Sequence, residues 1–66
     1  MIKGMENFNQ EIQERILEIY NMQMDAFGGQ IKGHELKEVF IQDDLPCVKF
    51  ENEDWYHYNL QNATWY

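Results

Sequence analysis

The sequence predicts an α+β fold in which one N-terminal amphipathic helix packs on a three- or four-stranded antiparallel β-meander. Apolar residues recur at three- and four-residue steps over about residues 8–27, and a double glycine interrupts this pattern at Gly28 and Gly29. Residues that favour β-strands gather further on, from about residue 36 to 66. With 66 residues the chain suffices for one small domain, which we expect to span residues 1–66.

The predicted helix begins near one of two asparagines and ends at the double glycine. Asn7 or Asn9 can cap the first turn, and with Asn7 as the N-cap, Gln10 can complete a capping box. Gly28 and Gly29 end the helix because glycine adopts left-handed dihedral angles at little cost. One apolar stripe then faces the sheet, formed by Met5, Phe8, Ile12, Ile16, Ile19, Tyr20 and Phe27.

Four strands are predicted after the glycines, separated by short polar turns. The expected strands are residues 36–41, 47–50, 55–58 and 63–66. The segment from residue 34 to 41 is also compatible with a short helix, since its apolar residues would share one helical side. We favour the strand because β-branched and aromatic residues end this run just before Asp43 and Asp44.

The chain is strongly acidic, with 12 Asp and Glu against 5 Lys and Arg and a formal net charge of −7. This charge opposes binding to a nucleic-acid backbone or to an anionic membrane surface, and it favours a basic protein partner. Solubility is the commoner reason for such acidity in a small domain. We expect a cytoplasmic protein, because the sequence shows no signal peptide or membrane span and Cys47 is its one cysteine.

The polar side of the predicted helix carries a row of carboxylates that lie within about 60° of one another around the helix axis. The row consists of Glu11, Glu14, Glu18 and Asp25. Arg15 is the one cation close enough to offset this charge. A solvated helix face is the ordinary explanation of such a row, and imitation of nucleic-acid phosphates is the functional one.

Aromatic residues are concentrated near the C-terminus, where alternate members of each strand should face the helix and the others the outer side of the sheet. Glu51, Glu53 and Asp54 lie among them and would repel a nucleic acid, which argues against a base-stacking platform. Aromatic rings rimmed by acids instead match a protein-binding patch. The expected anchors are Trp55, Tyr56, Tyr58 and Trp65.

Few residues could support catalysis. The segment that starts at His34 resembles the beginning of a zinc-protease motif, but Glu38 stands where the second histidine is required. Cys47 and His57 are the one candidate nucleophile and base, and they would approach each other in a hairpin of the second and third strands. A lone cysteine is more often a small buried apolar residue. We therefore expect no enzyme, no metal site and no cofactor.

These patterns together predict a non-catalytic binding module, an inhibitor that occupies a basic, nucleic-acid-binding surface of another protein. In size and charge the chain is analogous to virus-encoded inhibitors of host enzymes, including DNA mimics, although no motif identifies a family. The alternative is a homo-oligomer with a structural or ligand-sequestering role. In that case Leu17, Met22 and Met24 would meet their copies, together with the outer aromatic residues, across a two-fold axis.

Overall fold

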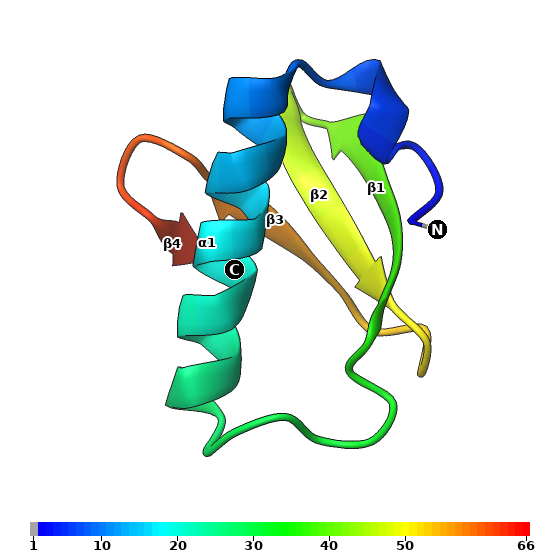
Figure 1. The fold of residues 1–66 in the computed structure, drawn as a ribbon, viewed down its shortest axis with the longest axis vertical. Helices are drawn as coiled ribbons and strands as arrows, with labels where there is room; N and C mark the ends of the chain where they lie inside the picture. The colour runs from blue at the N-terminus through cyan, green and yellow to red at the C-terminus, as the bar shows by residue number, and fades with distance from the viewer. Residues whose placement is uncertain (1) are drawn as a thin grey trace.

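A computed structural model describes residues 2–66 and confirms the predicted α+β arrangement. One helix, α1 (Gln10–Ala26), packs on one face of a four-stranded antiparallel sheet with the order β1-β2-β3-β4 (Figure 1). The strands are β1 (Leu36–Gln42), β2 (Leu45–Phe50), β3 (Trp55–Asn59) and β4 (Thr64–Trp65). The strand preferred for residues 36–41 is thus confirmed, and the helical alternative is wrong.

Helix α1 is capped by the second of the two candidate asparagines. The side-chain oxygen of Asn9 accepts a hydrogen bond of 2.9 Å from the backbone N–H of Ile12. Asn7 instead ends a short 3-10 helix, Met5–Asn7, that precedes α1. The helix therefore begins at Gln10, two residues after the predicted start.

The double glycine ends α1 as predicted. The N–H of Gly29 donates to the carbonyl of Met24 at 2.8 Å, and the N–H of Gly28 donates to the carbonyl of Asp25 at 3.0 Å. This pair of bonds is the Schellman arrangement, in which a left-handed residue reverses the chain. Within residues 2–66, no helix is both long enough and apolar enough to cross a membrane.

The hairpin between β1 and β2 is tighter than the sequence suggested. Gln42 pairs with Leu45, so the turn consists of Asp43 and Asp44 alone. Both have positive φ angles, 56° and 63°, as a two-residue type I′ turn requires. Aspartate tolerates this conformation better than most residues because its short side chain can bond locally.

A short N-terminal stretch covers part of the outer edge of β1. Lys3 forms a parallel bridge there, donating to the carbonyl of Lys37 at 3.2 Å and accepting from the N–H of Val39 at 2.8 Å. Gly4 follows with a φ of 85°, and a Cβ atom at this position would lie 2.1 Å from the carbonyl oxygen of Val39. Only glycine allows this approach.

The core lies between α1 and the sheet. Its fully or almost fully buried apolar side chains are Ile16, Ile19, Met24, Val39, Val48, Phe50 and Tyr58. One polar residue, Gln23, is buried among them, and its side-chain oxygen accepts a hydrogen bond from the hydroxyl of Tyr58. Helix α1 packs on this face of the sheet, and no helix covers the opposite face (Figure 1).

Candidate functional site

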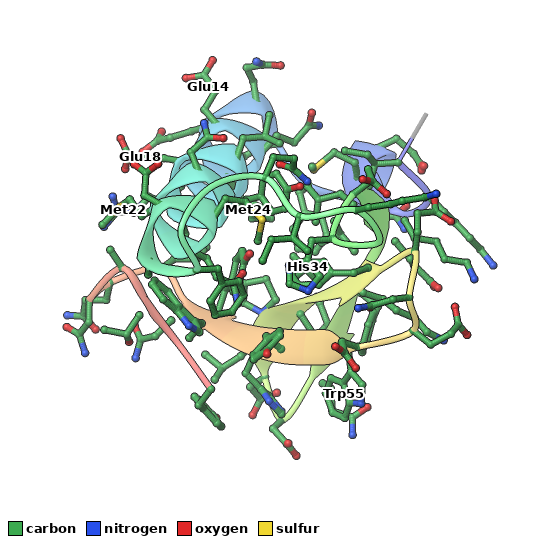
Figure 2. All side chains as sticks on the ribbon, turned by 90° about the horizontal axis from the view of Figure 1, so that it is seen from below. Glu14, Glu18, Met22, Met24, His34 and Trp55 are labelled. Carbon is green, nitrogen blue, oxygen red and sulfur yellow. The ribbon has the colours of Figure 1, made fainter. Side chains whose placement is uncertain are left out.

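The acidic row lies on the solvent side of α1. Glu11, Glu14, Glu18 and Asp25 are all exposed. Figure 2 shows Glu14 and Glu18 pointing away from the sheet.

One cation lies beside the row and is held in place from two sides. The Arg15 guanidinium forms an ion pair with Glu18, and its Nε donates to the carbonyl of Leu60 at 2.9 Å. This second bond joins the helix to the loop between β3 and β4. Arg15 thus offsets the charge of Glu18, and the other three carboxylates form no ion pair within residues 2–66.

The row is sparser than a strand of DNA. Its members span 14 residues of helix from Glu11 to Asp25, or about 21 Å, so neighbouring carboxylates stand on average roughly 7 Å apart along the axis. A single DNA strand carries one charge about every 3.4 Å along its axis. The helix therefore offers roughly half the linear charge of one strand.

An apolar hollow borders the row where α1 meets β4. It has a volume of about 380 Å³ and is lined by Met22, Ala63, Thr64 and Trp65. Met22, with 44% of its surface exposed, lies about 40° around the helix axis from Glu18. The structure thus brings three residues singled out from the sequence, Glu18, Met22 and Trp65, to one side of the molecule.

Two of the predicted surface residues belong to the core instead. Tyr58 is fully buried, and Met24 is 5% exposed, so neither can contact a partner in the folded protein. Tyr56 is half-buried, with its ring 5.7 Å from that of Phe50 and 6.3 Å from that of Phe27. The prediction of Tyr58 as an anchor and of Met24 as a self-association residue is therefore corrected.

The remaining self-association residues do not form one patch. Leu17 and Met22 are both exposed, by 39% and 44%, but they lie about 140° apart around α1, on opposite flanks of the acidic row. Leu17 lines a different hollow, together with Ile2 and Met5. A single two-fold contact centred on both residues would have to bury the carboxylates between them.

Trp55 lies on the far side of the molecule from the acidic row. It projects from the face of the sheet that α1 does not cover, whereas Glu14 and Glu18 project from the opposite side (Figure 2). One partner surface cannot contact both without wrapping around the domain. The prediction that the helix carboxylates and Trp55 form one binding surface is therefore corrected, because they belong to two separate surfaces.

The uncovered sheet face carries a row of neighbouring rings. The ring of Phe40 lies 5.8 Å from that of Trp55, which lies 5.0 Å from His57. His57 in turn stacks on Tyr66 at 4.6 Å. Phe40 and Tyr66 were not among the predicted site residues, although strand alternation places Phe40 opposite the buried Val39 and could have indicated it.

Cys47 and His57 are cross-strand partners on this same face, as a hairpin of β2 and β3 requires. The Nε2 atom of His57 lies 3.0 Å from a carboxylate oxygen of Asp43. Cys47 is fully buried, and this burial raises the pKa of its thiol. The thiol is therefore shielded from solvent and held in its protonated, weakly nucleophilic form.

Comparison of the chain with protein-family models, with curated proteins and with solved structures found no match. Among residues 2–66 no group of three or more His, Cys, Asp and Glu side chains is arranged to hold a metal ion.

Proposed function

We propose that this protein is a small non-catalytic binding module that uses one side of α1 to occupy a basic surface of a partner protein. A surface that binds nucleic acid best matches the exposed carboxylates of α1, because it is basic. A protein that occupies such a surface would inhibit the partner. The observation that carries this proposal is the apolar hollow of Met22 and Trp65 directly beside exposed carboxylates. An apolar centre with a charged rim is the usual anatomy of a protein interface.

The two parts of this surface have different tasks. The carboxylates attract a basic partner over a distance and raise the association rate, an effect that salt screens beyond about 8–10 Å. The hollow supplies the short-range burial that slows dissociation. The carboxylates are sparser than DNA phosphates, so we expect that charge alone does not give tight binding and that the hollow contributes to the affinity.

The test begins with partner capture on the immobilised protein, followed by elution with duplex DNA. A protein that this surface holds through a nucleic-acid-binding site should be released by DNA and by high salt. Binding kinetics of the recovered partner should then show an association rate at least about tenfold lower for the double variant Glu14→Lys/Glu18→Lys at low salt.

The matched control makes the same change of charge elsewhere. In Glu6→Lys/Glu51→Lys the altered carboxylates lie outside the acidic row, and neither makes an ion pair or side-chain hydrogen bond within residues 2–66. We expect this control to bind the partner much more like the unaltered protein. Equal loss in the two variants would show that total charge alone governs binding, and it would refute the proposed surface.

A second pair of variants tests the hollow. Met22→Ser should accelerate dissociation, whereas Leu17→Ser removes a similarly exposed apolar side chain from the opposite flank of the row and should not. Light scattering of the free protein addresses the homo-oligomer. If Met22→Ser converts a dimer to a monomer and no DNA-eluted partner is recovered, the hollow serves self-association and the inhibitor proposal is wrong.

A further inference from the structure

A second candidate binding site lies on the uncovered sheet face, independent of α1. Glu38, Lys49 and Trp55 stand in line across β1, β2 and β3, because Lys49 pairs with Glu38 on one side and with Trp55 on the other. Phe40 stands beside them, and its ring is tilted by 47° to that of Trp55. These residues and Gln42 line a hollow of about 290 Å³, which we call the sheet notch.

The two charged residues of the sheet notch, Glu38 and Lys49, differ in their partners. The Nζ atom of Lys49 lies 3.4 Å from one carboxylate oxygen of Glu53, and Lys37 holds the other oxygen at 2.6 Å. Glu38 is half-buried, and it has no ion pair or side-chain hydrogen bond within residues 2–66. Among residues 2–66 the buried side-chain atoms without a hydrogen-bond partner do not include the Glu38 oxygens, so this carboxylate is accessible to a cationic ligand.

We propose that the sheet notch binds an arginine side chain of a protein or peptide partner. A guanidinium group is planar, so it can stack on the exposed ring of Trp55 while its edge donates to the carboxylate of Glu38. Trp55 is 43% exposed, which leaves ring surface for this contact. Lysine fits less well because its compact, strongly hydrated ammonium cannot stack and bond bidentately.

A second copy of the chain fits this face poorly. Four strands spaced by about 4.8 Å and roughly five residues long present about 300–350 Å². A stable interface buries about 800 Å² on each partner. Two copies with a net charge of −7 each would also repel each other across the contact.

The test uses the two tryptophans as internal probe and reference. The protein, labelled with nitrogen-15, is titrated with N-acetyl-arginine-methylamide while the two indole N–H resonances are followed. The Trp55 resonance should shift and saturate in the millimolar range, whereas Trp65, on the other side of the molecule, should stay in place. The blocked lysine analogue should bind at least about threefold more weakly, and blocked citrulline, the neutral isostere, should produce no saturating shift.

The variant Glu38→Gln should weaken arginine binding by about tenfold, as expected when one charged hydrogen-bond partner is lost. Glu51→Gln is the matched control and should bind like the unaltered protein. Absence of an arginine shift at Trp55, equal binding of citrulline, or unchanged binding by Glu38→Gln would each overturn the proposal. A Trp55 shift that depends on protein concentration without ligand would overturn it too, and would show a second copy on this face.

Because Glu14→Lys/Glu18→Lys leaves the sheet notch intact, that variant should bind arginine like the unaltered protein. This result separates the inference from the proposed function.

Discussion

The buried bond between Tyr58 and Gln23 makes the sharpest prediction about stability. Both residues are fully buried, and the Tyr58 hydroxyl donates to the Oε1 atom of Gln23. In Tyr58→Phe that oxygen loses its partner, which should cost about 1–3 kcal/mol of unfolding free energy. The Nε2 atom of Gln23 already lacks a partner within residues 2–66, so no spare hydrogen bond compensates for the loss.

This cost is large for a domain of 66 residues, whose core rarely supplies more than about 3–5 kcal/mol. Each kcal/mol corresponds to roughly 4–8 °C in the melting temperature of so small a chain. Gln23→Met, a change that keeps an unbranched side chain, should cost a similar amount because it strands the Tyr58 hydroxyl. The double variant leaves neither polar group buried, so we expect it to recover most of the loss.

Urea unfolding followed by tryptophan fluorescence measures all four proteins. The double-mutant cycle should give a coupling free energy of at least about 1 kcal/mol. If the two single losses simply add in the double variant, the hydrogen bond contributes nothing and the reasoning fails.

The burial of Tyr58 predicts how stability depends on alkaline pH. Burial raises the pKa of Tyr58 well above its ordinary value of 10.0, so the folded state keeps this proton when the unfolded state has lost it. The stabilisation is complete below about pH 10 and decreases above it by about 1.4 kcal/mol per pH unit. Tyr58→Phe should show a shallower loss above pH 10; identical slopes for the two proteins would contradict the assignment.

Two further perturbations test the N-terminal crossing and the buried thiol. Gly4→Ala should cost more than about 1 kcal/mol in urea unfolding, because the new Cβ would collide with the Val39 carbonyl oxygen at a positive φ. Gly28→Ala, where a Cβ meets open space, should cost less, and the reverse order would show that the crossing is not tight. Cys47 should resist iodoacetamide in the folded protein and react once urea unfolds it, since burial both shields the thiol and raises its pKa. Rapid labelling without urea would mean that β2 opens under native conditions.

Local patterns in the sequence accounted for most of the fold. The apolar period of α1, its double-glycine end and the β-rich stretches are properties of neighbouring residues, and the structure confirms them. The bridge between Lys3 and Glu38 could not be predicted in this way. It joins distant parts of the chain. It also depends on Gly4, and nothing in the residues around Gly4 indicates that it lies against β1.

The candidate site was harder to predict because it depends on which side of an element each residue takes. Trp55 and Tyr58 are three residues apart in one strand, so they must point to opposite faces of the sheet. Strand alternation alone therefore assigns Trp55 and Tyr58 to opposite faces. It does not say which of the two faces the helix covers, because that depends on tertiary packing. Leu17 and Met22 likewise share an apolar character and an exposed position, but not a face of α1.

The separation of the acidic row from the sheet notch has a physical consequence for any partner. The domain measures 21 Å along its shortest principal axis, and a helix layer and a sheet layer stand between the two surfaces. Exposed charges more than about 8–10 Å apart are largely screened at physiological ionic strength, so we expect a charge reversed on α1 to alter the potential at Glu38 little. We therefore expect each proposed surface to attract its ligand with its own local charges. The two proposals accordingly predict that occupancy of one surface leaves the affinity of the other unchanged.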